Sequence, residues 1–101
     1  MIVEIQCLPT PAGDDARRYA HVEAAIERIQ QAGVRYEVGA LGTTLEGSPD
    51  TVWPLLRDVH EACLRSGAAS VITVIKLAQG AEAGDAATMD TLTAPWRAGG
   101  T

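Results

Sequence analysis

Aromatic side chains are scarce in this chain of 101 residues, which has no phenylalanine, two tryptophans and two tyrosines. The hydrophobic core must therefore be built mainly from alanine, valine, isoleucine and leucine, and the apolar fraction is 47%. A chain of this length is expected to form a single domain that buries roughly two thirds of its surface. A substantial core is therefore possible despite the missing rings.

Cysteine and long apolar runs are also scarce. Cys7 and Cys63 are the only cysteines, and each falls in an apolar pattern that is typical of a small core residue. Two cysteines are too few for a disulfide framework, and their spacing is not a metal motif. No run approaches the roughly 18 apolar residues of a membrane span, and the first residues carry no secretory signal. We expect a cytoplasmic protein with no membrane partner, no metal and no cofactor.

The charge balance is acidic, with a net charge of −5 and a pI of about 4.8. An acidic surface repels a phosphate backbone, so nucleic acid is not expected as a partner. The same charge mildly favours a cationic or neutral ligand.

Hydrophobic periodicity predicts strands where apolar residues alternate and helices where they recur every three or four residues. Strands are predicted at residues 2–8, 34–38, 43–46 and 69–78, and helices at 16–32 and 49–66. Asp14 or Asp15 is the predicted cap of the first helix, and Gly33 and Gly67 are the predicted helix stops. This order predicts an α+β, ferredoxin-like βαββαβ sandwich: a four-stranded antiparallel sheet with two helices on one face.

Residues 1–79 are the predicted domain, and residues 80–101 form a tail rich in glycine and alanine. We expect this tail to be weakly ordered or to dock on a neighbouring subunit. The last strand is apolar on both faces, which is typical of a strand that is covered on both sides. Since two helices cover only one face of the sheet, the other face is expected to be a subunit interface, a ligand site or both.

The segment from Leu41 to Asp50 combines a strand, a polar cluster and the start of a helix. Gly42 and Gly47 flank the strand, where the backbone can turn or approach a ligand closely. Ser48 is the predicted N-cap of the following helix, with Pro49 at its first position. The two threonines and the glutamate between the glycines are thereby held on a rigid element. Composition alone favours an ordinary strand-to-helix junction with solvated polar side chains.

Several short segments resemble the thiamine-binding protein family, and they lie within about residues 1–77. These segments are Tyr-Glu-Val at 36–38, Gly-Thr-Thr-Leu-Glu-Gly at 42–47, Val-His-Glu at 59–61 and Thr-Val-Ile-Lys at 73–76. The hexapeptide is the most specific of them. The resemblance implies a ferredoxin-like homotetramer, assembled through sheet faces, that binds thiamine or a related pyrimidine without transforming it.

The hexapeptide and its neighbouring strand carry side chains that suit such a ligand. Glu37 and Glu46 can accept charge-assisted hydrogen bonds from an aminopyrimidine. Thr43 and Thr44 can donate or accept hydrogen bonds, and Gly42 leaves room for a flat ring. These are the predicted ligand-binding residues. No aromatic partner for the thiazolium cation is identified, because Tyr36 falls on the predicted core side and Trp96 lies in the tail.

Two other classes of function stay open. An enzyme would need a cysteine within reach of His21 or His60, but both histidines are expected to be surface or interface residues, and we expect no catalytic residue. A structural or regulatory oligomer that binds another small ligand is the second alternative, because this topology hosts many functions. Lys76 is expected to form a salt bridge or to extend its amine to solvent.

Overall fold

The structure is a computed structural model that describes residues 1–82 and 87–97. Its strands are β1 (Ile2–Thr10), β2 (Arg35–Val38), β3 (Thr43–Glu46) and β4 (Ser70–Ala78). They form one sheet in the order β2-β3-β1-β4, and every neighbouring pair is antiparallel. The prediction of an α+β domain with a four-stranded antiparallel sheet is confirmed.

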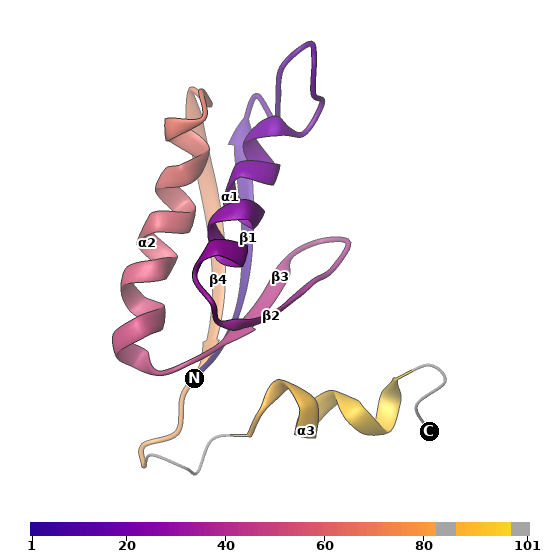
Figure 1. The fold of residues 1–101 in the computed structure, drawn as a ribbon, viewed down its shortest axis with the longest axis vertical. Helices are drawn as coiled ribbons and strands as arrows, with labels where there is room; N and C mark the ends of the chain where they lie inside the picture. The colour runs from indigo at the N-terminus through magenta and orange to yellow at the C-terminus, as the bar shows by residue number, and fades with distance from the viewer. Residues whose placement is uncertain (83–86, 98–101) are drawn as a thin grey trace.

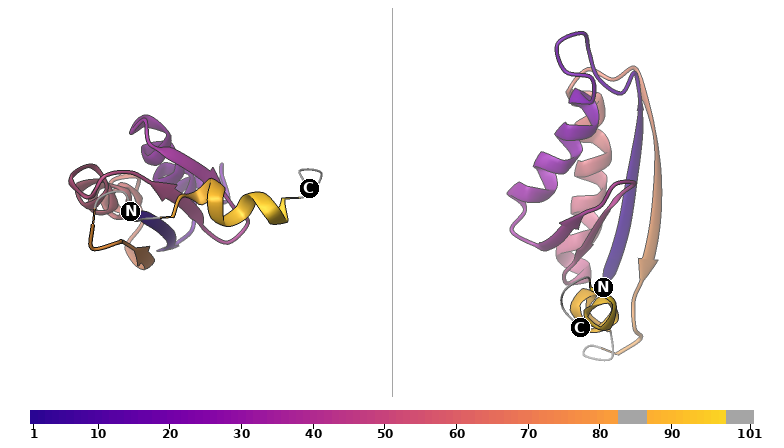
Figure 2. Two further views of the ribbon diagram at one scale, coloured as in Figure 1. Left: turned by 90° about the horizontal axis from the view of Figure 1, so that it is seen from below. Right: turned by 90° about the vertical axis from the view of Figure 1, so that its right-hand side faces the viewer.

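The helices are α1 (Ala20–Gln31), α2 (Pro49–Arg65) and α3 (Met89–Thr93), and the 3-10 turn η1 (Ala94–Trp96) follows α3. Figures 1 and 2 show α1 and α2 side by side along the strands, with α3 beyond one end of the sheet. Among the described residues, no helix has both the length and the apolarity that crossing a membrane requires.

The core lies between the sheet and the two long helices. Strand alternation turns Val3 and Ile5 of β1 and Leu45 of β3 inward, and helical spacing brings apolar residues of α1 and α2 onto them. The most deeply buried side chains, each less than 2% exposed, are Val3, Ile29, Leu45, Val52, Val59 and Cys63. Aliphatic residues thus build the core, as the lack of phenylalanine requires.

Helix α1 begins later than predicted. The predicted cap Asp14 instead closes a turn, because its Oδ1 accepts the backbone N–H of Ala16 at 3.0 Å and of Arg17 at 2.8 Å. The loop then folds back so tightly that a Cβ on Gly13 would lie 2.3 Å from the Arg17 carbonyl oxygen. Local side-chain bonding at Asp14 therefore competes with the helix, which starts at Ala20.

The predicted ends of both helices are confirmed. Gly33 and Gly67 have φ of 75° and 121°, the left-handed region that glycine tolerates. Ser48 is the N-cap of α2 with Pro49 at its first position, but its side chain forms no cap hydrogen bond. The Ser48 hydroxyl donates to Thr51 Oγ1 at 3.0 Å instead.

Part of the predicted tail packs on its own domain. Met89 is 3% exposed, and its backbone N–H donates to Glu46 Oε2 at 3.2 Å. The next residue, Asp90, pairs with Arg35 of β2 at 3.0 Å and with Arg97 at 2.6 Å. The short helix α3 is thereby attached to the β2–β3 hairpin. The prediction for residues 83–86 and 98–101 lies outside the described residues.

The second face of the sheet is open in the single chain. Register places Leu8 opposite Ile72 and Gln6 opposite Val74 on this face. Ile72 is 69% exposed, Val74 52% and Leu8 46%. Beside them Lys76 lies opposite Glu4, at 3.9 Å between charged atoms. The open face is therefore an apolar strip with charged residues at one end.

Candidate ligand pocket

The pocket results from a difference in strand length. β1 has nine residues and β3 has four. β4 pairs with β1 over its whole length, whereas the ladder between β1 and β3 ends at Ile5 opposite Thr43. From Gln6 onward, the edge of β1 on the β3 side has no strand partner in the described part of the chain. The backbone of a strand without a neighbour offers N–H and C=O groups for hydrogen bonding.

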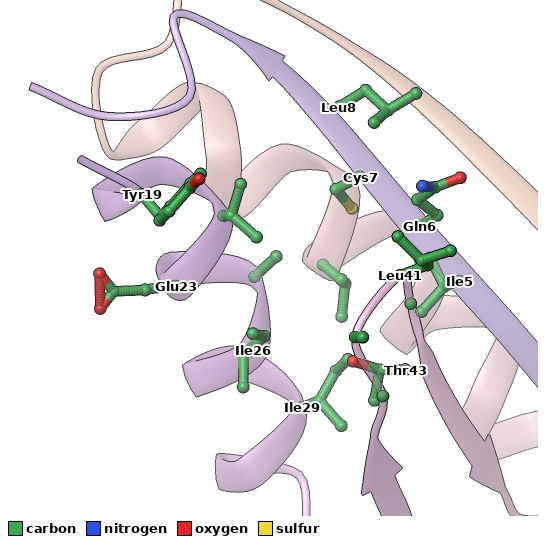
Figure 3. A pocket seen from close by; sticks show the side chains of 16 residues that line it. Ile5, Gln6, Cys7, Leu8, Tyr19, Glu23, Ile26, Ile29, Leu41 and Thr43 are labelled. Atoms are coloured by element: carbon green, nitrogen blue, oxygen red, sulfur yellow. The ribbon is translucent and has the colours of Figure 1, made fainter.

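Helix α1 and the β2–β3 loop close this edge into a pocket of about 530 Å³. Figure 3 shows β1 on one side, α1 on the other and the β2–β3 loop below. Most of the lining is aliphatic, which is usual for sites that bind small organic ligands. The aliphatic lining consists of Ile5, Leu8, Val22, Ala25, Ile26, Ile29, Ala40, Leu41 and Val59.

Thr43 is the most deeply buried polar group of this pocket, with a side chain only 4% exposed. No described residue forms a hydrogen bond with its hydroxyl. In the described chain, every side-chain nitrogen or oxygen that is fully inaccessible has a hydrogen-bond partner, so this unpartnered hydroxyl must be accessible. The hydroxyl therefore opens onto the pocket, beside Ile29 (Figure 3). A buried hydroxyl gains when a bound molecule supplies the missing hydrogen bond. Thr43 is thus a ready donor or acceptor for a ligand.

Gly42 allows the β2–β3 loop to lie close to β1. A Cβ at this position would lie 3.2 Å from the Ile5 carbonyl oxygen, tighter than ordinary contact. At the tip of the hairpin the Gly39 N–H donates to the Gly42 carbonyl oxygen at 2.8 Å, which closes the turn. A larger residue at 42 would push the loop away and widen the pocket.

Tyr19, the N-cap of α1, and Glu23 within the helix supply the aromatic ring and the carboxylate that line the pocket. Tyr19 is half-exposed, and the guanidinium of Arg18 lies 5.3 Å from its ring centroid, so the ring already attracts a cation. Glu23 Oε2 accepts from Arg17 Nη2 at 2.5 Å. Neither residue was predicted from the sequence as a ligand contact. Their four-residue spacing, shared with Val22 and Ile26 on one helix face, is the signal that could have found them.

The predicted ligand residues divide between the two faces of the sheet. Gly42 and Thr43 line the pocket. Thr44 lies opposite Glu37 in the β2–β3 ladder, with both side chains on the open face. Glu46 shares that face and accepts the N–H of Met89. A single cavity does not bring all of them together, and their contact with a ligand stays a prediction.

The prediction that both histidines are surface or interface residues is wrong for His21, which is 5% exposed within the single chain. Its Nδ1 lies 2.7 Å from Ser66 Oγ, so the ring joins the start of α1 to the end of α2. His60 is partly buried, with Nδ1 at 2.6 Å from Thr73 Oγ1. Thr73 in turn donates to the sulfur of Cys7 at 3.7 Å.

The two cysteines differ in their surroundings. Cys7 is half-buried and lines the pocket, whereas Cys63 is fully buried in the core. Burial, and next the neighbouring Cys7 sulfur, raise the pKa of the Cys63 thiol to about 12. A thiol of that kind is protonated near neutral pH and is a poor nucleophile. Within the described residues, no group of three histidine, cysteine or carboxylate side chains is arranged to hold a metal ion.

The fold is a small α+β domain with a pocket between α1 and β1. The model of the family described as thiamine-binding protein matches residues 3–93, and the chain belongs to this family. The match extends past β4 and includes α3, so the short C-terminal helix belongs to the family domain.

Individual relatives agree with this assignment. A UPF0045 protein of Clostridium perfringens is 37% identical over 75 residues, which cover 74% of this chain and 77% of the relative. A domain of unknown function from Bacillus cereus, named DUF77, has a TM-score of 0.77 at 36% identity and covers 95% of this chain and 90% of its own. A candidate thiamine biosynthesis/salvage protein of Thermotoga maritima has the same fold, with a TM-score of 0.79 at 24% identity over 95% and 97% of the two chains.

We predict that iodoacetamide does not modify Cys63 in the native protein at about pH 8, because its thiol is buried and protonated. Mass spectrometry after timed alkylation measures this, with protein unfolded in urea as the control in which both cysteines react. Rapid modification of Cys63 in the folded state would contradict the buried position of this thiol.

Proposed function

We propose that the protein binds thiamine, or its aminopyrimidine part, in the pocket between α1 and β1 and does not transform it. The observation that carries this proposal is the deeply buried Thr43 hydroxyl, which opens onto an aliphatic pocket and has no partner among the described residues. Membership of the thiamine-binding protein family supports the choice of ligand. A cavity of about 530 Å³ falls within the usual range for small-molecule sites.

The free edge of β1 suits the aminopyrimidine ring. This ring carries acceptor nitrogens beside an exocyclic amine, and a strand edge offers N–H and C=O groups side by side. The aliphatic side chains of α1 and of the β2–β3 loop would hold the faces of the ring. Thr43 would bond a further polar atom at the closed end of the pocket.

The mouth of the pocket suits the cationic thiazolium. Tyr19 offers an aromatic face, which attracts a cation, and Glu23 brings a carboxylate to the same side of α1. Arg17 and Arg18 now occupy these two groups. Thiazolium would replace the guanidinium of Arg18 over the ring.

Binding without chemistry fits the groups that line the pocket. Cys7 is a thiol that lines the pocket, but the imidazole of His60 bonds Thr73 and is linked to the sulfur only through that hydroxyl. Storage, delivery and sensing of the ligand are all compatible with a site of this kind. The ferredoxin-like arrangement that we infer for residues 1–79 is a common scaffold for such binding domains.

The second part of the proposal is a homotetramer assembled through the open face. Leu8, Ile72 and Val74 form an exposed apolar strip on neighbouring strands, and such strips mark interaction surfaces. Glu4 and Lys76, which flank the strip, provide opposite charges that a two-fold partner can pair with. A structural or regulatory oligomer would use the same surface without a ligand.

We predict that Thr43→Val weakens thiamine binding by about two- to tenfold, because one net hydrogen bond is lost while the side-chain volume is kept. Thr44→Val is the matched control, since the neighbouring threonine faces away from the pocket. Isothermal titration calorimetry measures both variants against thiamine, thiamine phosphate and the free aminopyrimidine.

A loss of affinity in Thr44→Val with normal binding in Thr43→Val would move the site to the open face, where Glu37 and Glu46 lie. No heat with any of the three compounds, together with an unchanged melting temperature at high ligand concentration, would reject thiamine as the ligand.

We predict that Val74→Glu dissociates the assembly, because a carboxylate in the centre of the apolar strip is costly to bury without a partner. Light scattering coupled to gel filtration measures the mass of the particle in solution. Leu64→Glu, on the exposed side of α2, is the control and should keep the native mass. An unchanged mass for Val74→Glu would show that the open face is not the interface.

A further inference from the structure

The loop between β1 and α1 and the turn between α2 and β4 lie at the same end of the molecule (Figure 1). A second hollow lies there. It is lined by the loop from Pro11 to Asp15, by Arg18 and His21, and by Gly67 of the α2–β4 turn. It shares no lining residue with the pocket between α1 and β1. The hollow is therefore a separate cavity, although its residue Arg18 lies against Tyr19 of the pocket.

The hydrogen bonds around His21 define which ring nitrogen carries the proton. Ser66 Oγ donates its hydrogen to the Cys63 carbonyl oxygen at 2.8 Å. The same oxygen lies 2.7 Å from His21 Nδ1 and must therefore accept from it. A neutral ring that donates at Nδ1 keeps a lone pair at Nε2.

This Nε2 atom faces the hollow. His21 as a whole is only 5% exposed, and no described residue forms a hydrogen bond at Nε2. In the described chain, every fully inaccessible side-chain nitrogen has a hydrogen-bond partner. Because Nε2 has none, it must be accessible, and the hollow is the opening that His21 lines. Gly67 leaves it uncovered: a Cβ there would lie 3.2 Å from Cε1 and 3.8 Å from Nε2 of this ring.

The charged groups around the hollow are Asp14, Asp15 and Arg18. Asp14 uses Oδ1 for the turn with Ala16 and Arg17, and its Oδ2 takes no part in that turn. The backbone N–H of Arg17 is the main cause that holds the pKa of the Asp14 carboxyl below its ordinary value, so this group is ionised. Arg18 directs its guanidinium over the ring of Tyr19. The carboxylates of Asp14 and Asp15 therefore line the same hollow as the imidazole lone pair.

We infer that this hollow is a second binding site, for a small ammonium or amidinium cation that donates an N–H to His21 Nε2 and faces Asp14 and Asp15. A hydrogen-bond donor satisfies the lone pair, and a positive charge complements the two carboxylates. A metal ion is a poorer occupant, since the described residues hold no cluster of three metal-ligating side chains.

The test uses methylammonium as the probe and tetramethylammonium as its matched control, a cation of equal charge without any N–H. Nitrogen NMR of histidine-labelled full-length protein at about pH 8.5, where imidazoles are generally neutral, follows His21 Nε2 during both titrations. We expect a saturable shift with methylammonium and none with tetramethylammonium.

Three variants test binding and stability. His21→Asn places an amide donor where Nδ1 was, keeps the bond to Ser66 and removes Nε2, so methylammonium affinity should fall about tenfold or more. Ser66→Ala removes the acceptor that holds the proton on Nδ1, so it should lower the melting temperature and also weaken the Nε2 shift. Asp15→Asn changes a surface residue and should weaken methylammonium binding without a change in stability. This variant tests the site even if His21→Asn does not fold.

Equal responses to the two cations would overturn the inference, because the N–H donor would then have no role. Unchanged methylammonium affinity in both His21→Asn and Asp15→Asn would do the same. Saturation of the Nε2 shift by zinc at far lower concentrations than methylammonium would also overturn it, in favour of a metal site. None of these results depends on whether the other pocket binds thiamine.

Discussion

The structure depends on the mismatch between a long central strand and a short hairpin. β1 pairs with β4 over nine residues, but β3 covers it only as far as Ile5. If β3 continued to the end of β1, its side chains would fill the space under α1 and no pocket would form. Because the hairpin stops, half of the central strand keeps a free edge, and α1 and the β2–β3 loop enclose it.

Side chains alternate along β3, so its residues are divided between the two faces of the sheet. Thr43 and Leu45 point to the helices, whereas Thr44 and Glu46 point to the open face. The inner pair contributes one residue to the pocket and one to the core. The outer pair faces the surface proposed for assembly, and Glu46 also holds the start of α3. A one-residue shift in register would exchange these roles, so the closure of the hairpin at Gly39 and Gly42 is decisive.

Much of the fold could be predicted from the sequence, because periodicity and glycine stops are local signals. The strands, the span of α2 and the positive φ of Gly33 and Gly67 follow from them. The start of α1 was not predicted correctly, because Asp14 bonds backbone groups that a helix would otherwise need. The burial of His21 was also missed, because its partner Ser66 is distant in the chain.

The site was only partly predictable, for a related reason. Composition draws attention to Thr43, Thr44 and the nearby carboxylates, and alternation assigns them to faces. It does not show where the ladder between β1 and β3 ends, which alone decides that Gln6 and Cys7 border a cavity. Tyr19 entered the pocket because α1 begins at Ala20 and leaves Tyr19 at its N-cap. Such features depend on contacts between residues that are distant in the sequence.

The most direct measurement is a map of backbone amide shifts in labelled protein as thiamine is added. Binding in the pocket predicts saturable shifts confined to the free edge of β1 from Gln6 to Leu8, to the first turns of α1 and to Gly39–Thr43. Shifts centred on Glu37, Thr44, Glu46 and the outer face of β4, with the free edge of β1 unmoved, would contradict it.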